Sequence, residues 1–334
     1  MEYTYQEDWD RPHLPSKEQT WQESDCYWFY DPVAQIGGFH RIGQKPNKGT
    51  GQLMLFVFKV GGERFVLNKA PRNEVALGPD ARQSHKQVVG GHTAESLGEG
   101  RMRYTWEEPE TSADIEFYQS FHLPRNWPAT NKGSANFEKT VNSDGHLECG
   151  GKLRGSIRIG KETYSIDALA HRDRSWGNRS DFAPMMHRYR MYSGTCGEAL
   201  SFASFFLDFN EFETVSMGYV DRHGKQEDVV NLRVAINFDY DGVTPLGSVG
   251  VLTLASGEKL RIESKVVQGF LTPMPGILNH SQDNISVFEY EGHTGFVDLE
   301  ISTNPGRGEY TPTQADVSFI AVTEGLTPSA DYDF

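Results

Sequence analysis

The chain has 334 residues, of which 37% are apolar and 12% are aromatic, and 34 are glycine. This length fits one large domain or two domains of roughly 150 residues, and we favour two. The 46 acidic residues outnumber the 32 basic ones and give a formal net charge of −14. The chain therefore lacks the surplus of lysine and arginine that a nucleic-acid-binding protein needs.

The three cysteines, Cys26, Cys149 and Cys196, are far apart and odd in number. Their spacing indicates neither a disulfide framework nor a zinc site. The acidic first ten residues lack the basic and apolar regions of a secretory signal, and no apolar run approaches the roughly 20 residues of a membrane helix. We therefore expect a cytoplasmic protein that does not insert into a membrane.

Residues 1–25 are rich in charge and contain Pro12 and Pro15. Such a composition predicts an N-terminal arm that drapes over the protein or is partly ordered.

Apolar residues alternate with period two over most of the remaining chain, and turn-forming pairs separate the alternating runs. Residues 53–60 lead into Gly61-Gly62, for example, and residues 153–159 lead into Gly160-Lys161. Long amphipathic helical patterns are absent. The sequence therefore predicts an all-β protein of sandwiches or barrels, with a domain boundary near residues 172–185. Further turn pairs are Asp144-Gly145, His223-Gly224, Asp241-Gly242 and Ser256-Gly257.

Residues 171–179 read His-Arg-Asp-Arg-Ser-Trp-Gly-Asn-Arg and follow one of these alternating runs. So many charges at the end of a strand are costly to bury unless they are paired. If the strand continues, His171 and Asp173 share one face, whereas the two intervening arginines and the tryptophan share the other. Side chains two apart on a strand are roughly 7 Å apart, so His171 and Asp173 are close enough to act on one small molecule.

Asp173 has two possible chemical roles and one structural alternative. An apolar cavity would raise its pKa, so that it could protonate a double bond or a leaving hydroxyl group. An adjacent arginine would instead hold it ionised, as a base or an anchor. In the structural alternative, Asp173 pairs with an arginine of the motif in an ion network at a domain junction, and Trp176 packs in the core. These alternatives stay open.

Aromatic residues recur between positions 189 and 212, among them Tyr192 and Phe205. They would line a cavity or fill a barrel core. His40, beside Gly37-Gly38, would reach the mouth of a pocket or remain a solvated loop residue.

Several catalytic signatures are absent, namely G-x-S-x-G, H-E-x-x-H, the P-loop, and G-x-G-x-x-G after a strand. Their absence argues against a hydrolase, a metalloprotease, a kinase or a dehydrogenase. We expect neither a cofactor nor a metal ion.

Residues 172–179 resemble the R-D-H-S-W-G-x-R signature of the lipocalin-like proteins related to carotenoid 1,2-hydratase (hydroxyneurosporene synthase) and of the AttH-like family. Weaker similarities lie at residues 37–47 and 292–300. In the hydratase pattern a histidine directly precedes the acidic residue, whereas here Arg172 does so and His171 stands one position earlier. Arg174 also stands where relatives often carry histidine.

The resemblance implies two lipocalin-like antiparallel β-barrel domains, residues 26–175 and 176–334, around an apolar cavity. It implies a cofactor-independent lyase, isomerase or cyclase that binds a hydrophobic small molecule, such as a terpenoid, a polyketide or a steroid-like compound. Hydration, dehydration, isomerisation and cyclisation all fit. The alternative is a non-catalytic carrier, which would have no acidic side chain in its cavity. The oligomeric state stays open, a homodimer included.

The resulting candidate site combines residues of the motif with residues outside it. Asp173, His171 and Trp176 are the candidate catalytic residues, with Trp176 stabilising a cationic intermediate through its π face. The candidate substrate-binding residues are Arg174, Arg179, Tyr192, Phe205 and His40.

Overall fold

The computed structural model describes residues 4–68, 74–127, 144–179, 188–210, 213–239, 244–274 and 279–303. The chain divides into two compact units, Met1–Asp181 and Phe182–Phe334. Within the described residues, no helix has the length and apolar character needed to cross a bilayer.

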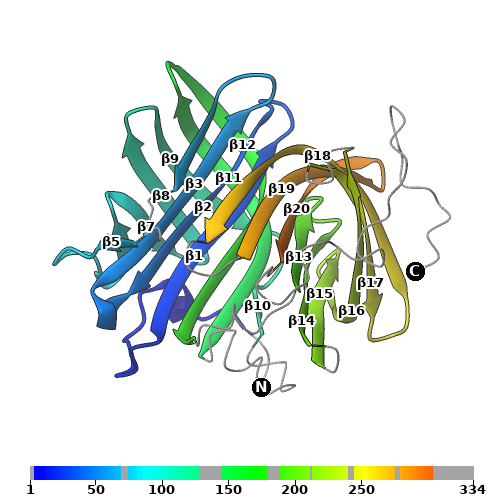
Figure 1. Ribbon diagram of the computed structural model, residues 1–334, viewed down its shortest axis with the longest axis horizontal. Coiled ribbons are helices and arrows are strands. Elements are labelled where there is room, and N and C mark those ends of the chain that lie inside the picture. Colours follow the sequence, from blue (N-terminus) through cyan, green and yellow to red (C-terminus); the bar gives the residue numbers. More distant parts are fainter. Residues whose placement is uncertain are drawn as a thin grey trace. The chain divides into compact units, whose positions relative to one another are not determined.

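The first unit contains twelve antiparallel strands, coloured from blue to green in Figure 1. These are β1 (Trp21–Asp31), β2 (Ile36–Lys45), β3 (Thr50–Lys59), β4 (Arg64–Asn68), β5 (Glu74–Ala76), β6 (Lys86–Val89), β7 (His92–Gly98), β8 (Arg101–Glu108), β9 (Thr111–Ser120), β10 (Arg125–Asn126), β11 (Gly145–Ile159) and β12 (Glu162–Asn178). Two short 3-10 helices accompany them, η1 (Glu7–Asp10) and η2 (Pro46–Lys48).

The strands of the first unit form one sheet in the order β4-β3-β2-β1-β12-β11-β9-β8-β7-β6, with β5 paired to β3 and β10 to β11. The sheet curls so that strands distant in this order meet. The side chain of Gln44 in β2 donates hydrogen bonds to the carbonyl oxygens of Ala81 (2.7 Å) and Val88 (3.3 Å), which lie at the β6 end of the sheet. Among the described residues, the two ends of the sheet order, near β2 and near β6, are joined by side-chain hydrogen bonds and not by a backbone ladder.

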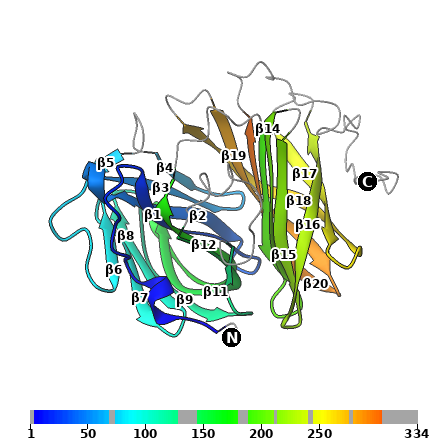
Figure 2. The same cartoon turned by 90° about the horizontal axis from the view of Figure 1, so that it is seen from below.

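Apolar side chains from most strands of this sheet fill the inner face of the curl. The segment before β1 is part of this unit, since η1 lies beside β7 (Figure 2) and Glu7 Oε1 accepts a hydrogen bond from the backbone N–H of Glu99 at 2.8 Å. The buried core residues include Tyr27, Phe29, Leu55, Tyr104, Trp106, Phe117 and Leu153.

The second unit is a closed eight-stranded antiparallel barrel in which β13 pairs with both β14 and β20 (Figure 1). Its strands are β13 (Arg188–Thr195), β14 (Ser201–Asn210), β15 (Glu213–Arg222), β16 (Lys225–Phe238), β17 (Pro245–Leu254), β18 (Lys259–Met274), β19 (Asn279–Tyr290) and β20 (His293–Thr303). The all-β prediction is confirmed.

Predicted turn pairs join several hairpins. His223 and Gly224 connect β15 to β16 and have φ angles of 52° and 79°, as a type I′ hairpin turn requires. Gly160, with φ of 60°, opens the turn between β11 and β12. The pair Asp241-Gly242 lies outside the described residues. β12 continues across the boundary expected between residues 175 and 176, and the division into units falls between Asp181 and Phe182.

Candidate functional site

The charged motif lies at the end of β12, and its side chains alternate between the two faces of the first sheet. His171 and Asp173 contact residues of β11 on one face. Arg172 and Arg174 bind Asp25 of β1 on the other face. The structure therefore brings His171 and Asp173 to one face, as the period-two pattern predicts.

Four side chains on that face form a cluster, which we call the His–carboxylate cluster: His146 and Glu148 of β11 with His171 and Asp173 of β12. His171 Nε2 donates a hydrogen bond to Glu148 Oε2 at 2.5 Å. His146 Nε2 lies 3.2 Å from Glu148 Oε1 and 3.4 Å from Asp173 Oδ2. Glu148 and His171 are fully buried, and the side chain of Asp173 is 15% exposed.

Neighbouring charges determine the protonation states of His146 and Asp173 in the His–carboxylate cluster. Burial alone would lower the pKa of His146, but Asp173 and Glu148 raise it to about 9. Burial alone would raise the pKa of Asp173, but His146, and then Arg179 and Arg41, hold it below its ordinary value. At neutral pH the cluster therefore contains a protonated imidazolium beside an ionised carboxylate.

Among the described residues, three of these side chains could hold a metal ion. One ligand atom from each of His146, Glu148 and Asp173 lies within 4.8 Å of the others, and imidazole and carboxylate groups both bind divalent cations. In this structure the three groups pair with one another. Among the described residues, Asp173 Oδ1 and His171 Nδ1 have no hydrogen-bond partner.

A row of aromatic side chains lies next to the cluster on the same face. Strand register places Trp28 of β1 opposite His171, Phe39 of β2 opposite Trp28, and Phe56 of β3 opposite Phe39. The rings of Trp28 and Phe39 stack with centroids 5.1 Å apart. The His–carboxylate cluster thus adjoins a row of buried aromatic side chains.

The opposite face of β12 carries a buried ion network. Arg172 Nη2 donates to Asp10 Oδ1 (2.5 Å) and Asp25 Oδ2 (3.1 Å). Arg174 donates to Glu23 Oε1 (2.6 Å) and to Asp25 Oδ2 (3.3 Å). All five side chains are at most 5% exposed, so the charges are compensated within the network as buried ions require.

Further groups complete this network from other elements. Arg82 Nη2 donates to Glu23 Oε2 at 2.7 Å, and the hydroxyl of Tyr104 donates to Asp25 Oδ1 at 2.6 Å. The segment before β1 contributes His13, whose ring stacks on Trp176 with centroids 3.9 Å apart. Trp176 therefore lies on the face of the ion network and not beside His171 and Asp173.

The remaining predicted site residues are not members of the His–carboxylate cluster. His40 is 1% exposed and faces the inside of the first sheet, so it is neither a loop residue nor at a rim. Arg179 follows β12, and its charge lowers the pKa of Asp173. In the second unit, Tyr192 belongs to the barrel core, whereas Phe205 packs against Tyr189. The side chains of Phe209 and Phe212 lie outside the described residues.

Comparison with protein families gives one match over most of the chain. The model of the domain of unknown function DUF7064 matches residues 6–305. The chain belongs to the DUF7064 family. A search of curated proteins by sequence finds no significant match.

Solved structures resemble this DUF7064 protein in fold at low sequence identity. CghA, solved with Sch210972, is 11% identical with a TM-score of 0.56, covering 88% of this chain and 94% of its own. The AttH-like protein of Nitrosomonas europaea is 12% identical (TM-score 0.57, 84% and 92% covered). Kievitone hydratase from Nectria haematococca is 12% identical (TM-score 0.54, 84% and 88% covered). These neighbours support the lipocalin-like fold of the DUF7064 chain.

Sequence reasoning missed the acidic and histidine partners of the motif. His146 and Glu148 alternate directly after the Asp144-Gly145 turn, which was the available signal for inward-pointing polar residues on a strand. Glu23 and Asp25 alternate in the same way within β1. Neither pair of residues is recognisable as part of a site from the sequence alone. Their role is visible only once β1 and β11 are placed on either side of β12.

Proposed function

We propose that this DUF7064 protein is an enzyme that binds a hydrophobic small molecule and reshapes it by acid–base chemistry without a cofactor. The observation that carries this proposal is the His–carboxylate cluster, in which a protonated histidine is held by two carboxylates beside an aromatic row. Buried titratable groups with strongly perturbed pKa values are frequent at catalytic sites. The presence of a hydratase among proteins of the same fold supports the same class of reaction.

His146 is the proton donor in this proposal. Its pKa of about 9 keeps it protonated at neutral pH, and a positioned acid of this kind contributes typically 10² to 10⁴ to a rate. Asp173 is the ionised anchor rather than the donor, because its pKa is lowered. His171 orients Glu148 through their hydrogen bond. Glu148 and Asp173 are the acceptors for a proton released later in the reaction.

The proposed reactions share one carbocation intermediate. The imidazolium of His146 transfers its proton to a carbon of a double bond and leaves a carbocation, which the π face of Trp28 stabilises. Water adds to the cation and gives its proton to a carboxylate in a hydration, and the reverse sequence is a dehydration. Loss of a different proton from the cation to a carboxylate of the cluster gives an isomer. Attack by a second double bond forms a ring and a new cation, which then loses a proton to a carboxylate.

The substrate class follows from the aromatic row. Trp28 and Phe39 stack, Phe56 lies opposite Phe39 in the strand register, and all three side chains are buried. Such apolar aromatic surroundings suit a terpenoid, a polyketide or a steroid-like compound. The second candidate function is a non-catalytic carrier that uses the same aromatic row. In that case the cluster would be only a buried ion pair that stabilises the sheet.

The experiment starts from the small molecules that copurify with the protein from its native cells. They are extracted, identified by mass spectrometry and incubated with the protein in D₂O and in H₂¹⁸O. An acid–base enzyme incorporates deuterium into the compound or converts it to a product, whereas a carrier returns it unchanged. His146→Gln should slow this conversion by about 10² to 10⁴ while retaining binding. His85→Gln, at a histidine that is 49% exposed, is the matched control and should leave the rate unchanged.

A further inference from the structure

Two carboxylates of the His–carboxylate cluster stand directly opposite each other on neighbouring strands. Glu148 of β11 and Asp173 of β12 are register partners, and their side chains share one face of the sheet. Like charges in this position destabilise a sheet unless a positive group lies between them. His146 takes that place, with Nε2 3.2 Å from Glu148 Oε1 and 3.4 Å from Asp173 Oδ2.

A single N–H group cannot bond well to both of these oxygens. Charge-assisted N–H···O hydrogen bonds are usually about 2.7–2.9 Å long, and both distances in the cluster are longer. Among the described residues, Glu148 Oε1 accepts no hydrogen bond, although its side chain is fully buried, and neither does Asp173 Oδ1. Buried polar atoms are normally satisfied, so these carboxylates lack a partner that bonds to several acceptors at once.

The spacing of the three ligand atoms suits a metal ion. Zinc binds imidazole nitrogen and carboxylate oxygen at about 2.0–2.2 Å, usually in a tetrahedron, whose ligand atoms are roughly 3.3–3.6 Å apart. The two distances from His146 Nε2, 3.2 Å and 3.4 Å, are close to this range. The third pair of ligand atoms lies within 4.8 Å, and rotation of the partly exposed Asp173 side chain would shorten that distance.

Neighbouring groups hold two of the three ligands in place. The ring of His146 stacks on Trp127, with centroids 5.4 Å apart and an interplanar angle of 21°. His171 Nε2 bonds to Glu148 Oε2 at 2.5 Å, which leaves Oε1 for an ion. Carboxylates that bind metal ions are typically hydrogen-bonded in this way by a further side chain.

The cluster is also open to solvent on one side. The side chain of Glu148 is fully buried, whereas those of His146 and Asp173 are 9% and 15% exposed. An ion would therefore reach the cluster past Asp173. Three protein ligands leave a fourth position for a water molecule, as in zinc sites that are not fully closed by protein.

We propose that His146, Glu148 and Asp173 bind one divalent transition-metal ion such as Zn²⁺, with water in the remaining position. On binding, Nε2 of His146 gives its proton to water and its lone pair bonds to the ion, while each carboxylate contributes one oxygen. Imidazole with carboxylate suits such an ion better than Mg²⁺, which prefers oxygen ligands and keeps its own waters.

The ion and the proton of His146 exclude each other, because both use the same lone pair of Nε2. Zn²⁺ should therefore inhibit the reaction proposed above, and a chelator should restore it. This inhibition rests on the proposed function, whereas ion binding does not. Binding is measured without substrate, and the isotope experiment is done in metal-free buffer, so that the two proposals can fail separately.

The test is calorimetric titration of the metal-free full chain with Zn²⁺, followed by X-ray absorption spectroscopy of the loaded protein. One ion should bind per chain, with one imidazole nitrogen and otherwise oxygen ligands at about 2.0–2.2 Å. Asp173→Asn deletes a ligand and should weaken binding by at least about 100-fold, the upper end of the loss for an outer partner.

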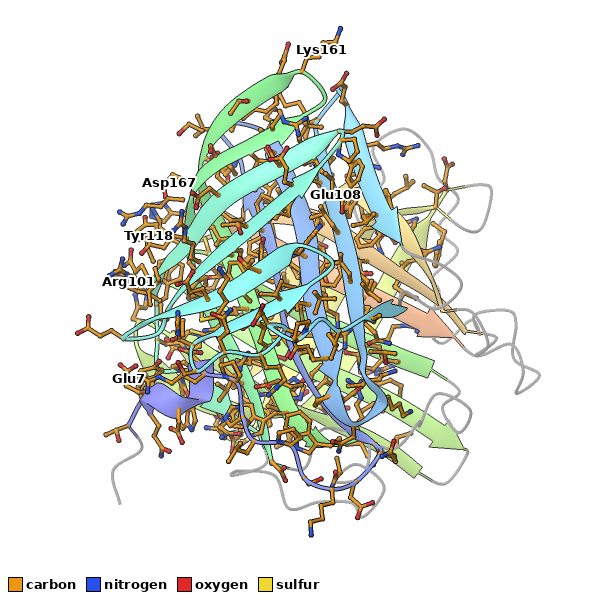
Figure 3. All side chains as sticks on the ribbon, turned by 90° about the vertical axis from the view of Figure 1, so that its left-hand side faces the viewer. Glu7, Arg101, Glu108, Tyr118, Lys161 and Asp167 are labelled. Carbon is orange, nitrogen blue, oxygen red and sulfur yellow. The ribbon has the colours of Figure 1, made fainter. Side chains whose placement is uncertain are left out.

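Asp167→Asn is the matched control. Asp167, labelled in Figure 3 beside Tyr118, lies on the same face of β12 as Asp173 but is 63% exposed and pairs with Lys152 at 3.7 Å. This variant should bind Zn²⁺ as the wild type does.

Three results would overturn the proposal. One is the absence of saturable binding of a single ion by the wild type. Another is an absorption spectrum that shows sulfur or more than one imidazole around the ion, which would place it elsewhere in the chain. The last is equal Zn²⁺ affinity in wild type and Asp173→Asn, with thermal unfolding used to check that the variant is folded. The first two results come from the wild type and do not depend on the folding of any variant.

Discussion

At the scale of single residues, the unusual feature is a histidine that gains basicity although it is buried. Two carboxylates lie within 3.4 Å of His146 Nε2, and their attraction for the imidazolium outweighs the cost of burying its charge. The positive charge of protonated His146 therefore balances the charge of these carboxylates, and in the proposed reaction its proton is transferred to the substrate.

This arrangement predicts a dependence of stability on pH. The pKa of His146 is about 9 in the folded protein against 6.5 in the unfolded chain. Its protonation therefore stabilises the fold fully below pH 6.5, and this contribution, at most roughly 3 kcal/mol, is lost as the pH rises through about 9. Urea denaturation should show the free energy of unfolding of the wild type falling over this interval. Asp173→Asn should flatten the fall, and equal slopes in both proteins would contradict the assignment.

Part of this site was predictable from sequence. The period-two pattern correctly separated His171 and Asp173 from the arginines, because alternation is a property of one strand. The partners His146 and Glu148 were not predictable, because they lie on β11 and depend on the register between two strands. Trp176 lies on the face opposite the cluster, as the same pattern predicted, because position 176 has the parity of the arginines.

At the scale of elements, β1 and β12 are held together by charge as well as by their backbone ladder. Asp25 of β1 accepts hydrogen bonds from Arg172, Arg174 and Tyr104. Asp25→Asn would leave two buried guanidinium groups short of one negative charge and should lower the free energy of unfolding by about 3 kcal/mol or more. Asp114→Asn breaks the exposed pair with Arg103 and should cost less than about 1 kcal/mol. Chemical denaturation of both variants measures the difference, and similar losses would argue against the network.

A second prediction at this scale concerns the contact between β2 and β3. A Cβ atom at Gly38 would lie 2.2 Å from the carbonyl oxygen of Phe56, whereas one at Gly78 would have no atom within 4 Å. Gly38→Ala should therefore destabilise the protein by about 1 to 3 kcal/mol, as overpacking does. Gly78→Ala should change stability little. Equal stability of the two variants in thermal unfolding would contradict the close approach of β2 and β3 at Gly38.

At the scale of the whole molecule, alternation and turn pairs predicted an all-β chain, and the length of the chain favoured two domains. The second unit closes through backbone hydrogen bonds as a barrel. The first unit curls and is bridged by side chains such as Gln44 and His40. Sequence patterns do not distinguish these two outcomes, because the number of strands and their register decide closure.

The segment before β1 also acts at this scale, since it supplies part of the ion network of the first unit. Asp10 binds Arg172, and the carbonyl oxygens of Trp9 and Arg11 each accept a hydrogen bond from Arg174 at 2.7 Å. Deleting residues 1–11 should lower the free energy of unfolding by about 3 kcal/mol or more, because buried arginines lose their partners. Asp8→Asn, at an exposed residue of the same segment, is the control. A truncated chain as stable as the wild type would show that the segment is only an arm.

The proposed chemistry requires that His146 is protonated at neutral pH. An NMR titration of the ¹⁵N-histidine-labelled protein, with His146→Gln used to assign the signal, measures the pKa of this residue without any knowledge of the substrate. The structure predicts a pKa of about 9, reduced in Asp173→Asn. A value at or below 6.5 would leave the cluster without a proton to donate and would contradict the proposed chemistry.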